Sequence, residues 1–195
     1  MSIVLQGSTR GSVTLQEPAV AGTTVLTLPA VTGTVLTTTS PKAGNVIQVV
    51  QTVKTSVFTT SSAMPTFADI TGLSATITPA SASNKVLVTV TGVMGVSPNG
   101  YAMAVNLVRT STSIAIGDAR GSTTRCFAGG TSNTADARSL TVCFLDSPAT
   151  TSATTYKVQL SAESGSTAII GGCSDGVQVY HFSTPTIITL QEIAA

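Results

Sequence analysis

One short segment of the sequence matches a catalytic pattern. Residues 172–176, GCSDG, fit the G-x-S-x-G motif, in which Ser174 would be the nucleophile. That motif requires a helix after the serine, and an acid followed by a histidine further along the chain. Here the β-prone run VQVYHF follows, and Asp175 is the only acid before His181, the chain's one histidine. Because the acid directly adjoins the serine, a triad cannot form, and the segment predicts a glycine-rich hairpin turn.

The cysteines and the histidine do not form a recognisable nucleophile pair. Cys126, Cys143 and Cys173 have no C-x-x-C spacing, and their odd number favours buried free thiols in a protein made in a reducing cytosol. One disulfide with a spare thiol is the alternative. His181 could act as the base for a cysteine, but a single histidine next to Phe182 is more typical of a core or interface residue.

The acidic residues are too scattered to indicate a particular chemistry. Asp118, Asp146 and Asp175 fall in expected loops, where calcium ligands or a pair of glycosidase carboxylates are the functional alternatives. We prefer the simpler interpretation, because turns favour aspartate for local hydrogen bonding in any protein. The sequence contains no zinc-type Cys/His spacing, no P-loop and no G-x-G-x-x-G. We therefore expect no enzyme, no cofactor and no metal site.

Aromatic side chains that could stack on sugar rings are scarce. The chain has five Phe, three Tyr and no Trp. Tyr101 and Tyr180 are the candidates for a lectin-like contact. Ordinary core or interface positions are the preferred interpretation of both.

Charge is the most informative property of the composition. Charged residues make up 9% of the 195 residues, against about 25% in typical domains, and the net charge is +1. This balance predicts no binding to nucleic acid, and no apolar run is long enough for a membrane span. Soluble proteins usually stay dispersed through mixed surface charges, so the deficit favours a surface covered by partners. A neutral, threonine-rich monomer is the alternative.

The elements that would position any of these residues are strands. No window has helical periodicity, whereas segments such as 155–161 alternate apolar and polar residues with a period of two. Turn clusters rich in Gly, Pro, Asn and Asp separate these segments. The pattern predicts an all-β, antiparallel β-sandwich of jelly-roll type over residues 43–195. We expect its strands within 45–58, 72–79, 85–93, 102–109, 140–145 (as a central strand), 155–161, 176–182 and 186–193.

The N-terminal segment lacks the residues for a core of its own. Residues 13–38 have the sequence VTLQEPAVAGTTVLTLPAVTGTVLTT and carry one charge. They contain a weak internal repeat that is too short to form a solenoid. Fully extended, it would reach about 85 Å. We therefore expect an extended anchoring arm and linker over residues 1–42, whose apolar side chains bind a partner surface. These side chains are Val13, Leu15, Val25, Leu26, Leu28, Val35 and Leu36.

The same segment carries a family resemblance. Together with the preceding Gly-Ser it resembles a stretch common near the N-termini of structural proteins of tailed bacteriophages, such as tail fibres, head fibres and decoration proteins. Residues 67–90, 145–161 and 186–195 resemble the β-domain of small virion proteins, particularly of phages that infect cyanobacteria and marine bacteria.

The resemblance implies a homotrimer on the virus particle. The expected function is a capsid cement or decoration protein, synthesised in the host cytoplasm and located on the capsid surface. Its arm would bind the major capsid protein or another virion protein, and its β-domain would clamp neighbouring capsomers. The alternative is a short head or tail fibre that contacts host surface polysaccharide, although 195 residues leave little room for a shaft. A depolymerase and a cellular adhesion module are less favoured, the latter because no export signal is visible.

Overall fold

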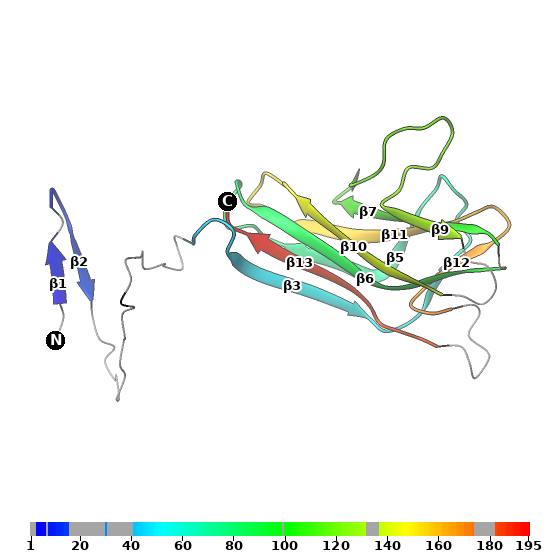
Figure 1. Ribbon diagram of the computed structural model, residues 1–195, viewed down its shortest axis with the longest axis horizontal. Helices are drawn as coiled ribbons and strands as arrows, with labels where there is room; N and C mark the ends of the chain where they lie inside the picture. Colours follow the sequence, from blue (N-terminus) through cyan, green and yellow to red (C-terminus); the bar gives the residue numbers. More distant parts are fainter. Residues whose placement is uncertain are drawn as a thin grey trace. The chain divides into compact units, whose positions relative to one another are not determined.

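The structure is a computed structural model that describes residues 3–6, 8–15, 30, 41–98, 100–131, 137–173 and 182–195. The chain divides into two compact units, Met1–Val35 and Leu36–Ala195, and each is described by itself. In the described residues, all elements of regular secondary structure are β-strands (Figure 1). The predicted all-β class is therefore confirmed.

The N-terminal unit contains a short hairpin. Strands β1 (Ile3–Gln6) and β2 (Ser12–Leu15) pair antiparallel, with Ile3 opposite Leu15. A two-stranded hairpin alone is marginally stable in water. Of the expected partner-binding residues, Val13 and Leu15 lie on β2. The other five, Val25, Leu26, Leu28, Val35 and Leu36, lie outside the described residues, so the extended arm over 1–42 stays a prediction.

The larger sheet of the second unit contains β3 (Val46–Lys54), β4 (Phe58–Thr60), β6 (Lys85–Ser97), β10 (Arg138–Asp146), β12 (Thr167–Ile170) and β13 (Thr186–Ile193). β10 and β13 both pair with residues 86–91 of β6, so they lie on its opposite edges. β3 pairs with the other side of β13. β12 pairs with the end of β6, and β4 lies beyond it.

The smaller sheet contains β5 (Ala68–Ile77), β7 (Ala102–Arg109), β8 (Thr112–Ile114), β9 (Ala128–Thr131) and β11 (Thr154–Ala162). β11 pairs with β5 on one side and with β7 on the other. β8 and β9 follow one another along the remaining edge of β7. Since all these pairings are antiparallel and the two sheets enclose one core, the unit is a β-sandwich, as the sequence predicts (Figure 1).

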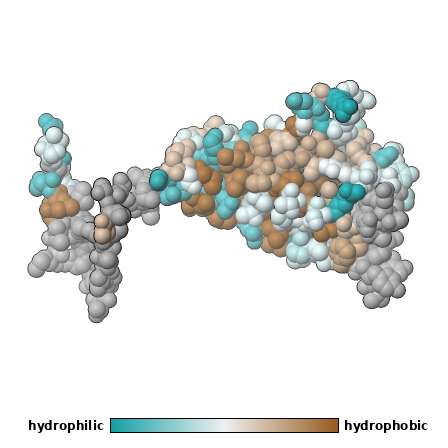
Figure 2. Space-filling model, in the orientation of Figure 1, coloured by the Kyte–Doolittle hydropathy of each residue, from teal (hydrophilic) through white to brown (hydrophobic). Residues whose placement is uncertain are grey.

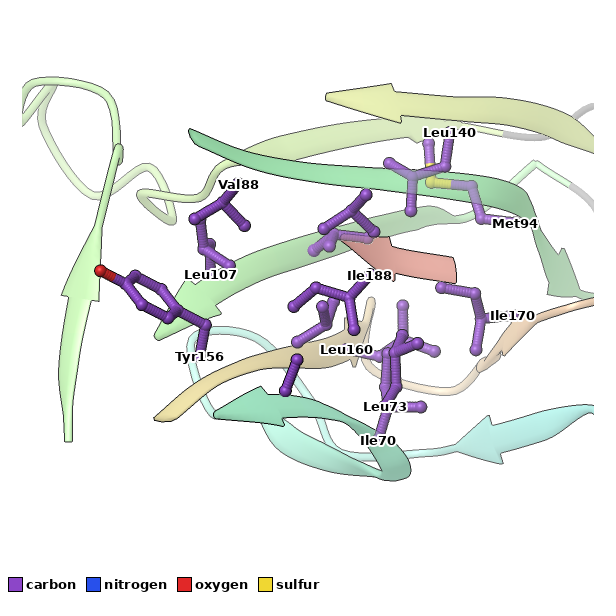
Figure 3. Packing of buried hydrophobic residues seen from close by; sticks show 14 of the residues in the cluster. Ile70, Leu73, Val88, Met94, Leu107, Leu140, Tyr156, Leu160, Ile170 and Ile188 are labelled. Carbon is purple, nitrogen blue, oxygen red and sulfur yellow. The ribbon is translucent and has the colours of Figure 1, made fainter. Parts of the chain in front are cut away.

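The core lies between the two sheets and is filled by alternate residues of their strands (Figure 3). On β11, Tyr156, Val158 and Leu160 are buried while the intervening side chains are partly exposed. Full burial of a Val or Leu side chain contributes about 1.5–3 kcal/mol. Further buried residues shown in Figure 3 come from both sheets: Ile70, Leu73, Val88, Met94, Leu107, Leu140, Ile170 and Ile188.

Some expected strand positions need correction. The run 45–58 is divided into β3 and β4 by residues 55–57. The strand expected over 72–79 begins earlier, at Ala68, as β5. Gly72, with φ at +82°, lies at a register shift against β11, and the strand continues through this irregularity instead of starting there. The run 140–145 was predicted to be a central strand, but β10 pairs only with β6 among the described strands. Most of 176–182 lies outside the described residues.

Candidate functional site

The three cysteines are free thiols in different surroundings. Cys173 is buried, Cys126 is partly buried and Cys143 is exposed, and none forms a disulfide. The free thiols agree with the preferred interpretation from the sequence, but the expectation that they are buried is wrong for Cys143. Burial raises the pKa of the Cys126 thiol, whereas a reactive cysteine needs a lowered pKa to supply the thiolate.

Most of the candidate catalytic motif, residues 172–176, lies outside the described residues. Ser174, Asp175, Tyr180 and His181 lie outside the described residues, so the hairpin-turn interpretation stays a prediction. Asp118 lies in an exposed loop. Within the described ranges, no group of three or more His, Cys, Asp or Glu side chains is placed to hold a metal ion.

The expectation that Asp146 lies in a loop is wrong. Asp146 is the last residue of β10 and is buried, and its two carboxylate oxygens both lie 2.8 Å from Nη1 of Arg109. The hydroxyl of Tyr156 donates to Oδ2 over 2.6 Å. Burial, and then the hydrogen bond to Asp146, raise the pKa of Tyr156, so that it remains a neutral donor. Asp146 is therefore satisfied within the protein, and its role is structural.

A second buried carboxylate, Glu192 on β13, joins three segments at one end of the sandwich. The side-chain amides of Gln48 and Asn84 and the backbone N–H of Ala80 all donate to it, the last over 2.7 Å. Burial raises the pKa of Glu192, but the bonds from Asn84, Gln48 and the backbone of Ala80 and Ser81 outweigh it, so the pKa lies below its usual value. This group therefore connects β13 to β3 and to the segment that precedes β6.

The outer surface of the larger sheet presents the most distinctive arrangement. Cross-strand pairing places outward residues of β3, β13, β6 and β10 in three rows of four. We call these residues the uncharged face: Val53, Ile187, Thr91 and Thr141 in the first row, Gln51, Thr189, Thr89 and Cys143 in the second, and Val49, Gln191, Leu87 and Leu145 in the third.

The outer rows of the uncharged face mix apolar and polar side chains, whereas the middle row is polar. The first row pairs valine and isoleucine with two threonines, and the third row carries a valine and two leucines beside a glutamine. Val49 is 56% exposed and Leu145 is 48% exposed. In the middle row the amide of Gln51 donates to Thr189 over 3.0 Å, and the hydroxyl of Thr89 donates to Cys143 over 3.6 Å. These polar groups are therefore partly satisfied within the sheet, which lowers the cost of covering them.

Figure 2 shows the consequence on the molecular surface. Hydrophobic and near-neutral residues cover much of the sandwich in the view in which β3, β13, β6 and β10 face the reader in Figure 1. Sequence reasoning missed this surface. A signal was available, since β3 and β10 carry apolar residues at both inward and outward positions, a pattern that the prediction for 140–145 attributed to a central strand.

The smaller sheet carries a pocket of about 460 Å³ beside β7 and β8. Its wall combines the apolar side chains of Phe67 and Ile116 with hydroxyls such as those of Ser113 and Thr123. Asn106 also lines it; this residue is 4% exposed, and its Oδ1 atom has no hydrogen-bond partner. Arg125 lines it as well, and its Nε donates to the carbonyl of Gly117. The wall thus combines hydroxyl, apolar and cationic groups.

The orientation of Asn106 follows from a chain of hydrogen bonds across the outer surface of this sheet. The Asp69 carboxylate accepts from Lys157 over 2.7 Å and from the amide of Gln159 over 2.7 Å. Gln159 must therefore present its oxygen to Asn106, whose Nδ2 donates to it over 3.2 Å and to Ser113 over 2.7 Å. This arrangement leaves the Asn106 oxygen as the free acceptor.

In the part of the chain that the structure describes, no helix has the length and apolar character needed to span a membrane. No protein-family model matches the sequence, and a search of curated proteins finds no match.

Proposed function

We propose that this chain is a non-enzymatic structural protein of a bacteriophage virion, a homotrimeric capsid cement or decoration protein. Residues 1–42 bind the major capsid protein or another virion protein, and the domain over 43–195 clamps neighbouring capsomers. The observation that carries the proposal is the shortage of charge, 9% of residues, combined with the uncharged face. A protein of this composition is better suited to a covered position in an assembly than to free dispersion in solution.

The sequence resemblance and the strand order add support. The orders β3-β13-β6-β10 and β5-β11-β7-β9 place sequentially distant strands side by side, and we interpret this as a jelly roll. Jelly rolls occur in viral capsid and lectin domains. Fold alone does not identify a function, so the strand order supports the proposal only together with the resemblance and the composition.

Anchoring through residues 1–42 is expected to depend on more than apolar contact. Seven buried Val and Leu side chains contribute on the order of 10 kcal/mol gross, and ordering each residue costs about 1–2 kcal/mol. The net gain per arm is small. Binding then requires strand pairing with the partner surface, or the combined action of three arms in a trimer.

Deleting residues 1–42 tests the anchor. We expect the remaining domain to fold and assemble, but to be missing from purified particles. The measurement is protein copy number per virion, from stained gels of particles assembled with the full-length or the truncated chain. A cement protein is present in hundreds of copies. Normal incorporation of the truncated chain would contradict the assignment of the arm.

Particles that lack the protein test the clamping role. We expect them to lose their DNA at a lower temperature than complete particles, because fewer contacts then hold neighbouring capsomers together. Adding the purified protein back should restore the original release temperature. Unchanged heat resistance of the depleted particles would count against cementing.

A short fibre that contacts host polysaccharide remains the second candidate, and the pocket at Asn106 is the observation that favours it. The hydroxyl and apolar groups of its wall match the two kinds of surface on a sugar ring. Under this alternative, purified protein at micromolar concentration adsorbs to host cells and competes with infecting phage. Failure of both assays would remove this candidate.

A further inference from the structure

We infer that the uncharged face is the contact between copies of this chain. Its outward valines and leucine are concentrated on the two edge strands of the sheet: Val49 and Val53 on β3, and Leu145 on β10, each about half exposed. Single exposed apolar residues are common on monomers. Here Val53 lies directly beside the partly buried Ile187, and Leu145 lies directly beside the partly buried Leu87, so that the exposed apolar side chains occur in cross-strand pairs.

The edge strands of the sheet are uncharged along most of their length. Among the described strands, β3 pairs only with β13, and β10 pairs only with β6. On β3 the only charged residue is Lys54 at its last position, and on β10 the charged residues are the terminal Arg138 and Asp146, the latter buried. The uncharged face therefore extends to both edges of the sheet.

The character of the face favours a second copy as its occupant. A charged partner group buried against it would find no counter-charge, and burying an unpaired charge is strongly unfavourable. A second uncharged face avoids that cost, and its exposed valines and leucine can pack against those of the other copy. Lys85, which lies next to the third row opposite Ile193, and Lys54, which follows Val53 on β3, place charges at the margins.

The area of the face indicates a weak contact. The three rows span five residues on each of four strands spaced about 4.8 Å apart, and so cover roughly 330 Å². Two such faces bury roughly 650 Å² in total, which is in the range of weak, transient interfaces. The contact itself does not depend on a role in a virion. Packing of the face on itself joins two copies about a two-fold axis, so this contact is separate from the threefold contact of the proposed trimer.

Cys143 provides a direct probe, because it lies in the middle row of the face and is exposed in the single chain. The experiment uses the full chain with Cys126→Ser and Cys173→Ala, so that Cys143 is the only thiol, and measures its rate of reaction with a maleimide alongside the mass by light scattering. We expect a mass of several chains and labelling at least tenfold slower than in the same protein carrying Val49→Asp. That substitution places a charge on an exposed position of the face, and should give a monomer with unchanged circular dichroism.

Two controls separate this contact from other effects. A protein with Cys143→Ser and Ser74→Cys carries its thiol on the outer side of β5, and its labelling should be equally fast with and without Val49→Asp. Light scattering of the unmodified chain and of Leu145→Asp gives the same comparison without any cysteine substitution.

Three outcomes would overturn the inference. They are a monomeric mass at every concentration, an assembly in which Cys143 still reacts at the rate found with Val49→Asp, and slow labelling in a monomer. The last would mean that another part of the same chain covers the face. None of these results depends on particles, so failure here is distinct from failure of the virion proposal.

Discussion

Asp146 and Glu192 are buried carboxylates, and each is held by several donors. Arg109 and Tyr156 bind Asp146, while Gln48, Asn84 and backbone N–H groups bind Glu192. A buried charge without such partners would destabilise the fold. Both groups are therefore structural, and they bring together segments that are distant in the sequence.

Glu192 gives a pH-dependent prediction. Because its pKa is lowered in the folded protein, it binds a proton less readily there than in the unfolded chain. Its contribution to stability is fully present above the unfolded pKa of about 4.3, and is lost as the pH falls through the folded value. Glu192→Gln should lower the free energy of unfolding at pH 7 by about 1–3 kcal/mol, and by less near pH 3. Urea unfolding at both pH values measures this.

Asp69 is the matched control for that experiment. Its pKa is also lowered, mainly by the hydrogen bond from Lys157, but its side chain is about half exposed. Exposed pairs contribute about 0–1 kcal/mol, so Asp69→Asn should have a much smaller effect at pH 7. An equal loss for the two variants would contradict the structural role assigned to Glu192.

At the scale of the strands, β6 is the organising element. Its first part pairs with β13 and its last part with β12 along the same edge, and Gly92 lies between these two pairings. A Cβ atom at Gly92 would lie 2.9 Å from the side chain of Thr186, which is buried. The missing side chain thus allows β13 to begin close against β6.

Gly92→Ala should therefore destabilise the sandwich by about 1–3 kcal/mol, the usual cost of overpacking. Gly117→Ala is the control, since a Cβ there meets nothing within 4 Å and its φ is not in the left-handed region. Thermal unfolding of the two variants and the unmodified chain makes the comparison. Equal melting temperatures for all three proteins would show that Thr186 can move aside without loss.

For the molecule as a whole, self-association through the uncharged face, as inferred above, would link folding to assembly. A partner that binds only the folded state stabilises it by mass action, so the stability of a self-associating protein rises with its concentration. We do not expect the outer surface of the smaller sheet to contribute to self-association. It carries the Lys157–Asp69 ion pair and the hydrogen-bond chain to Asn106.

We therefore expect the melting temperature to rise with protein concentration over the micromolar range. Leu145→Asp should remove this dependence, because it charges the uncharged face at a position that is exposed in the single chain. Thr76→Asp, at an exposed position on β5, should leave the dependence intact. Differential scanning calorimetry at several concentrations makes the measurement. A melting temperature independent of concentration in the unmodified chain would contradict self-association.

The sequence by itself determined the fold class and most strand positions. Alternation with a period of two is a local property, and the segments 85–93, 102–109, 155–161 and 186–193 all lie within or coincide with strands. The free state of the cysteines also followed from composition and spacing. Short strands such as β8 and β12 were missed because three or four residues carry too little periodic signal.

Only the tertiary structure decided which side chains meet. Val49 and Leu145 share a row, and Asp146 meets Arg109 and Tyr156, because strand pairing joins residues far apart in the chain. Local alternation tells which residues point to the same side of one strand, but not which strands become neighbours or which side faces the core. The uncharged face depends on both, and so it could be identified only after the strands had been placed in their sheet.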